Sequence, residues 1–176
     1  MCCETEMFCF ARNPLLSFED LYAGKICAAL DRQHPRDLYD VYLLLKNEGI
    51  NERLKNAFLV YLMSHNRPMV ELLAPHKIDI EPMYHAEFEG MTYELISLQD
   101  LEEAFDQLVR KVHGALTDAD RHFLASFKQG EADWSAFPIP EVERLPAIQW
   151  KILNLNRMDS AKRQKATTKL EKLLQE

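Results

Sequence analysis

Three points in the chain carry the signature of a helix N-terminus, and they limit its possible folds more than any other feature. Ser17, Ser97 and Thr117 are each followed three residues later by an aspartate. In that spacing the hydroxyl and the carboxylate accept hydrogen bonds from backbone N–H groups that a helix leaves free. Only five glycines occur in 176 residues, which leaves little turn chemistry for a many-stranded sheet. We therefore expect a mainly α fold.

Apolar residues at helical spacing extend from these caps and from other start signals. Pro35 suits a first helical turn, and Gly49 suits a helix end. The best strand candidate is 7–12, so we predict a helical bundle with at most one or two short strands near the N-terminus. We divide the chain into a strand-like segment and linker over 1–16 and a helical domain over 17–176. The predicted helices cover 17–32, 35–47, 51–65, 69–73, 97–116, 117–128, 145–158 and 160–174. The rest of 66–96, which three prolines interrupt, is expected to be loop.

Composition excludes several classes of function. No apolar run approaches the roughly 20 residues that span a bilayer, and the N-terminus does not resemble a signal peptide. We therefore expect a cytoplasmic protein that does not associate with a membrane. The four cysteines and six histidines show no metal-ligand spacing, so we predict no metal site. We interpret Cys27, inside a helical pattern, as a small core residue. The net charge of −7 argues against indiscriminate nucleic-acid binding.

Four charged residues fall on what otherwise read as two packed helices. Lys25 shares a face with apolar and small residues, while Arg36, Asp37 and Asp40 lie along the first turn of the next helix. A structural interpretation pairs Arg36 with Asp40 and gives Lys25 a salt bridge across the two helices. A functional interpretation has Lys25 and Arg36 hold phosphates while one aspartate orients the lysine or receives a proton. Residue types alone do not choose between them.

The stretch "FEDLYAGKICAALDRQHPRDLYD", from Phe18 to Asp40, resembles the C-terminal helical half of the AbiEii/AbiGii-type nucleotidyltransferase toxins. The family motif reads approximately LxAxKxxAxxxRxxxRDxxDL, and this chain departs from it only at Val41. Later stretches, "FLVYLMSHNRPMVELL", "EFEGMTYE" and "LPAIQWKILNLNRM", are similar to further family segments. The resemblance implies nucleotide transfer from an NTP, with Mg²⁺, to an RNA such as tRNA. It also implies the toxin role in a toxin–antitoxin or phage-defence (abortive infection) system, and hence an antitoxin partner.

Carried over at matching positions, the resemblance makes Lys25 a nucleotide-phosphate ligand, with Arg36 beside it. Asp37 or Asp40 becomes the catalytic carboxylate of the late motif. Family members hold their metals with a Gly-Ser and a later Asp-x-Asp, but this sequence has no Gly-Ser. Its only Asp-x-Asp, at 118–120, is expected to be a helix cap. We therefore expect a chain that is inactive alone: a truncated gene product, a fragment, or one part of a split enzyme whose N-terminal catalytic half is encoded separately. The edge that missing strands would leave uncovered favours association, as a homodimer or with a second chain.

The C-terminal segment is richer in basic residues than the rest of the chain. Its basic residues either dock on the acidic body or contact an RNA backbone. For the second interpretation we single out Lys162, Arg163 and Lys165. A different class of function, a noncatalytic helical module that binds a protein such as an antitoxin, stays open.

Overall fold

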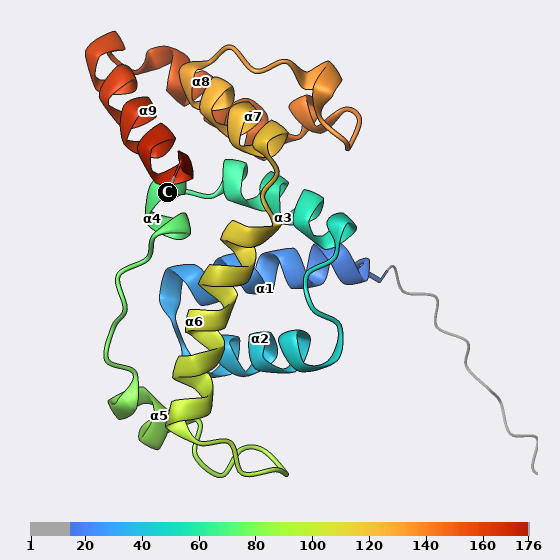
Figure 1. Cartoon of the computed structure of the whole chain (residues 1–176), viewed down its shortest axis with the longest axis vertical. Coiled ribbons are helices and arrows are strands. Elements are labelled where there is room, and N and C mark those ends of the chain that lie inside the picture. Colours follow the sequence, from blue (N-terminus) through green and yellow to red (C-terminus); the bar gives the residue numbers. More distant parts are fainter. Residues whose placement is uncertain (1–14, 176) are drawn as a thin grey trace, which may run out of the picture.

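The computed structural model describes residues 15–175, and within that range the chain contains helices and no strands (Figure 1). The mainly α prediction is confirmed for this part of the chain. The strand candidate at 7–12 lies outside the described residues. The α-helices are α1 (Phe18–Arg32), α2 (Pro35–Asn47), α3 (Glu52–Ser64), α4 (Met69–Leu73), α5 (Glu81–Glu87), α6 (Leu98–Ala115), α7 (Asp118–Gln129), α8 (Pro146–Arg157) and α9 (Ser160–Gln175). Two short 3₁₀ turns, η1 (Trp134–Ala136) and η2 (Val142–Arg144), lie between α7 and α8.

The three predicted caps begin helices as expected. The Ser17 hydroxyl accepts from the Asp20 N–H, and complete capping boxes start α6 at Ser97 and α7 at Thr117. The prediction of loop over 74–96 is wrong at α5. Pro82 stands in the first turn of this helix, where a missing N–H costs nothing, so a proline that appeared to interrupt structure instead helps to start it.

The lower part of the molecule is built around α1. This helix packs against α2 on one side and α3 on another, and α6 covers α2 (Figure 1). The buried side chains at these contacts are aliphatic or aromatic, with Ile26, Leu30, Leu38, Leu59 and Leu108 at 0–1% exposure. Burial of this kind stabilises the fold by about 25 cal/mol per Å² of apolar surface. The α1–α2 pair is therefore a rigid support for the side chains it presents.

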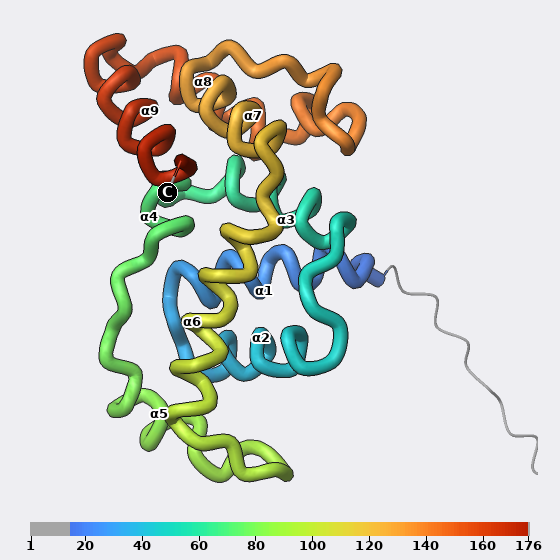
Figure 2. The backbone as a smooth tube through the Cα atoms, in the orientation of Figure 1, coloured from blue at the N-terminus to red at the C-terminus, as the bar shows by residue number. Residues whose placement is uncertain are grey.

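The upper part of the molecule consists of α7, α8 and α9, which α6 joins to the lower part (Figure 2). The α9 helix packs on α7 and reaches α4, and α8 packs on α3. None of the described helices is long and apolar enough to cross a membrane.

Candidate functional site

A tight turn joins α1 to α2 and brings the predicted site residues together. Gln33 adopts a left-handed conformation, with φ 51° and ψ 33°, which ends α1. Its buried side chain donates to the His76 carbonyl at 2.7 Å and accepts from the Ile78 N–H at 3.1 Å. Pro35 then begins α2 at once. This turn, tied to the segment after α4, fixes how α2 returns along α1.

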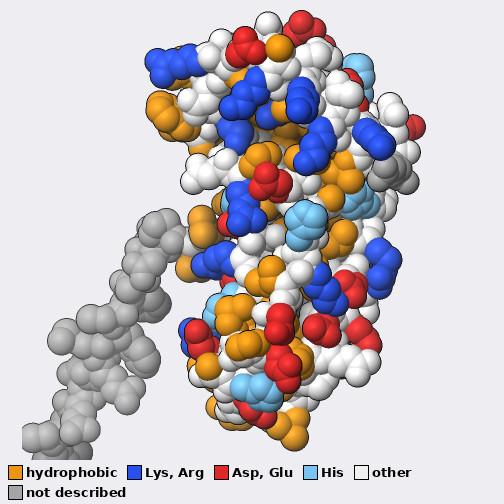
Figure 3. Space-filling view, turned by 90° about the vertical axis from the view of Figure 1, so that its left-hand side faces the viewer, with side chains coloured by type: hydrophobic (Ala, Val, Ile, Leu, Met, Phe, Trp, Pro, Cys, Tyr) orange, Lys and Arg blue, Asp and Glu red, His pale blue; other side chains and the backbone are white. Residues whose placement is uncertain are grey.

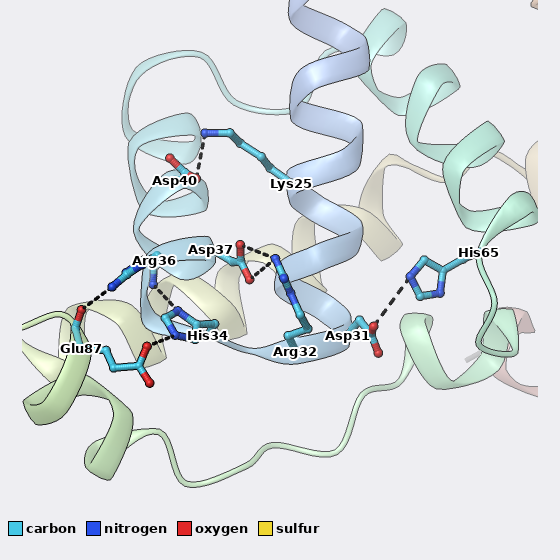
Figure 4. A network of polar contacts seen from close by, with 9 residues as sticks. All are labelled: Lys25, Asp31, Arg32, His34, Arg36, Asp37, Asp40, His65 and Glu87. Carbon is cyan, nitrogen blue, oxygen red and sulfur yellow. Dashed lines mark hydrogen bonds and ion pairs between the residues drawn. The ribbon is translucent and has the colours of Figure 1, made fainter.

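Two cations on α1 face two carboxylates on α2. Lys25 Nζ lies 2.8 Å from Asp40 Oδ2, and Arg32 Nη2 lies 2.9 Å from Asp37 Oδ2 (Figure 4). Lys25 and Arg32 are seven residues apart, about two helical turns, so they share one face of α1. We call Lys25, Arg32, Asp37 and Asp40 the charged ladder. The predicted salt bridge from Lys25 across the helix pair is confirmed.

The predicted pairing of Arg36 with Asp40 is wrong. Arg36 Nη2 instead donates to the Glu87 carbonyl at 3.3 Å, at the end of α5. His34 caps α2 by accepting from the Arg36 N–H at 3.2 Å, and its other ring nitrogen lies 3.1 Å from the Glu87 carboxylate (Figure 4). Arg36 therefore contacts the end of α5, and the cation that pairs with Asp40 is Lys25.

The charged ladder is partly accessible to solvent. The Lys25 and Asp40 side chains are 30% and 33% exposed, and the Lys25 ammonium lies 5.5 Å from the centre of the Tyr22 ring. Asp37 is more enclosed, at 15% exposure. Its Oδ2 atom is buried and, although close to Arg32, has no well-aligned hydrogen bond. Lys25 therefore has donors left for an anionic ligand approaching from solvent.

The carboxylates of the charged ladder do not fit a metal site, because each already faces a cation. Among residues 15–175, no group of three or more His, Cys, Asp or Glu side chains is placed to hold a metal ion. Asp118 and Asp120, the only Asp-x-Asp in the sequence, lie in the first turn of α7 as predicted, and Asp120 forms the capping box with Thr117. Asp120 is also paired with Lys55 at 2.7 Å in the interior.

The three basic residues singled out on α9 are in different environments. Arg163 is half-buried and donates to the Leu155 carbonyl at 3.5 Å, whereas Lys162 and Lys165 are exposed. Arg163 thus helps to hold α9 on α8, while the two lysines leave their charges at the surface.

Sequence reasoning missed two participants, Arg32 and Glu87. Arg32 occupies a motif position and lies seven residues after Lys25, so helical periodicity could have placed it on the same face. Glu87 lies 51 residues beyond Arg36, and no local pattern indicates that contact.

The chain was compared with known protein families, and one family model matches it. The matching model is described as "Nucleotidyl transferase AbiEii toxin, Type IV TA system" and covers residues 5–154. The chain therefore belongs to the AbiEii family. The family implies an NTP and an antitoxin. No match was found among curated proteins or among solved structures.

Proposed function

We propose that this chain binds the NTP in a nucleotidyl transfer to RNA such as tRNA, with Lys25 holding the nucleotide phosphates. In that reaction an RNA hydroxyl oxygen forms a bond to the α-phosphorus and gives up its proton to water. The bond from the α-phosphorus to the bridging oxygen breaks, and pyrophosphate leaves. Such a step needs positive charge held on rigid elements, because negative charge develops on the phosphate oxygens. The observation that carries the proposal is the 2.8 Å contact between Lys25 and Asp40 across two packed helices.

The other residues of the cluster have supporting roles in this proposal. Asp40 orients the Lys25 ammonium, and Asp37 holds Arg32 on the same face. Arg36 is exposed, and one of its five N–H donors goes to Glu87, so the remaining donors can reach a phosphate. In this proposal Asp40 and Asp37 are positioning residues.

We further propose that a second domain or chain with metal-binding carboxylates docks beside Lys25 and supplies Mg²⁺. Apolar side chains at the start of α1 are exposed, including Leu15 at 91%, Leu16 at 70% and Leu21 at 44%. The ring centre of Phe18 lies 4.5 Å from that of Tyr22, and the ring centre of Tyr22 lies 5.5 Å from the Lys25 ammonium. An apolar surface that leads to the proposed phosphate ligand suits a docked partner. Transfer is then expected only when that partner is present.

The test is NTP binding by the purified chain and by Lys25→Ala. Loss of a charge-assisted contact of about 1.5–3 kcal/mol weakens binding by roughly 10- to 100-fold. Lys46→Ala is the matched control, because Lys46 also lies 5.5 Å from a tyrosine ring and pairs with a carboxylate, Glu94, at 3.8 Å. Calorimetric titration with each of the four NTPs and Mg²⁺ measures the Kd. Equal Kd values for the two variants would overturn the proposal.

A second candidate function, a noncatalytic antitoxin-binding module, has one observation in its favour. The segment between α5 and α6 exposes Met91, Tyr93 and Leu95, at 62%, 111% and 96%. Tyr and Met side chains are enriched where proteins meet. Capture of the purified cognate antitoxin, lost in Tyr93→Ala with Leu95→Ala, together with no NTP binding by the unaltered chain, would favour this function over the first.

A further inference from the structure

A groove separates α9 from the end of α1 and the α4 segment. Its walls are Asp31 to Gln33 of α1 and its turn, residues 67–78 around α4, and Lys169, Lys172 and Leu173 of α9. Its volume is about 1030 Å³. The groove therefore lies between the lower and upper parts of the molecule, on the side that faces the viewer in Figure 3.

Two carboxylates of the groove lining, Asp31 and Glu71, face four cationic side chains, those of Arg32, Arg67, Lys169 and Lys172, so the charge of the groove is net positive. Asp31 pairs with Arg67 at 2.6 Å, and Arg32 pairs with Asp37 of the charged ladder. Both arginine side chains stay more than half exposed, at 53% and 64%, and retain N–H donors that these ion pairs do not use. Lys169 and Lys172 are exposed, and within residues 15–175 no carboxylate forms an ion pair with either.

The two groove lysines belong to a longer stripe on α9. Lys162, Lys165, Lys169 and Lys172 follow one another at intervals of three or four residues, which places them on one face over about 15 Å of helix. The face that packs on the molecule instead carries Thr167, Leu170 and Leu174, which are buried. Figure 3 shows Lys and Arg side chains gathered over this upper half.

We propose that this groove and the lysine stripe bind the phosphate backbone of the RNA that accepts the nucleotide. The proposal rests on the proposed function, which makes RNA the acceptor. A row of ammonium groups, spread over several helical turns, matches an extended chain of phosphates better than a single anion. Arg32 belongs both to the groove and to the charged ladder, so RNA held in the groove runs toward Lys25.

The test compares two variants that each remove two positive charges. Lys169→Gln with Lys172→Gln removes the two lysines that line the groove, and glutamine preserves helix propensity. Arg110→Gln with Lys111→Gln is the control, because these exposed residues lie on α6 and line a different pocket. The probe is a fluorescein-labelled RNA hairpin with a single-stranded 3′ tail, and the readout is its Kd by anisotropy from low to high salt.

We expect the groove variant to bind the hairpin about tenfold more weakly at low salt. The negative slope of log K against log salt should become shallower by about 2, since each lysine–phosphate contact contributes about 1 to its magnitude. The control should match the unaltered chain in both quantities. Equal affinity and slope in the two variants would overturn the proposal, as would no RNA binding by the unaltered chain. It would also be overturned if the groove variant lost binding to DNA of the same sequence but retained binding to the RNA.

NTP binding measured on the same samples separates this proposal from the proposed function. The groove variant should keep the NTP Kd of the unaltered chain, because Lys25 is untouched. If no sample binds NTP while the groove variant alone loses RNA, the proposed function fails and the groove stands as an RNA site. If NTP binds and RNA binding is unchanged in the groove variant, the groove proposal fails alone.

Discussion

Cys27 shows how the packing around α1 controls the chemistry of a single residue. Its side chain is 3% exposed among the core residues, as the helical pattern predicted. Burial, with a smaller contribution from the negative charge of Asp31, raises the pKa of the Cys27 thiol to about 12. The thiolate is the reactive form of cysteine, so folding suppresses the reactivity of this residue.

We therefore predict that Cys27 in the folded chain resists alkylation by iodoacetamide at pH 8, and reacts readily once the chain is unfolded in urea. Peptide mass spectrometry with and without urea measures the modified fraction at Cys27 alone. Comparable modification under the two conditions would mean that α1 does not bury this side chain in solution.

Single residues also show where prediction from sequence stops. Lys25 and Asp40 were both selected from a short stretch, and helix geometry accounts for their contact. Arg36 was expected to pair with Asp40 because they are four residues apart, but it instead donates to the carbonyl of Glu87, 51 residues further along the chain. Local spacing records which contacts a helix permits, whereas tertiary packing selects among them.

At the scale of elements, the close approach of α3 to α1 follows from the small residues of α1. A Cβ atom added at Gly24 would lie 3.4 Å from Cε1 of Tyr61 on α3, at the limit of ordinary contact. The starts of several helices could be predicted from the sequence, because capping residues lie next to the helix that they begin. The α5 helix was not, because its start combines Pro82 with an N-cap, Ile80, that provides no side-chain hydrogen bond.

Gly24→Leu should lower the free energy of unfolding by about 1–3 kcal/mol, because the added atoms meet the Tyr61 ring in a packed interface. Gly114→Leu is the control. Gly114 also lies in a helix, α6, but nothing is within 4 Å of an added Cβ, so replacing its glycine should stabilise by up to about 1 kcal/mol. Urea unfolding followed by circular dichroism measures both, and a stabilised Gly24→Leu would contradict the packing of α1 on α3.

For the whole molecule, a buried ion pair joins the lower and upper helices. Lys55 of α3 and Asp120 of α7 are 2.7 Å apart and about nine-tenths buried. Burial by itself raises the pKa of Asp120, but hydrogen bonds from Lys55 and Thr117 outweigh it and lower the pKa overall. The ionised form is thus favoured in the folded state. This contribution to stability is present above the carboxyl's unfolded pKa and is lost as the pH falls through its lower folded value.

Asp120→Asn should therefore lower the free energy of unfolding at pH 7 by about 3–5 kcal/mol, because it leaves the Lys55 charge buried and unpaired. The loss of stability on acidification below about pH 4 should also be shallower in this variant than in the unaltered chain. Asp100→Asn is the matched control, since Asp100 holds the same position in the α6 capping box without a lysine partner. Its expected cost is about 1 kcal/mol. Urea titrations at pH 7 and pH 3 give the cost of each variant at each pH. Equal costs for the two variants would contradict a structural role for the Lys55–Asp120 pair.

The position of α9 has an evolutionary consequence. The family model matches residues 5–154, whereas α9 begins at Ser160, so one wall of the groove lies inside the matched segment and the other outside it. The charged ladder belongs entirely to the inner part. If both proposals hold, mutations in α9 change how tightly the acceptor RNA is held without altering the residues that hold the nucleotide. The affinity for RNA can then be tuned through α9 separately from the nucleotide site.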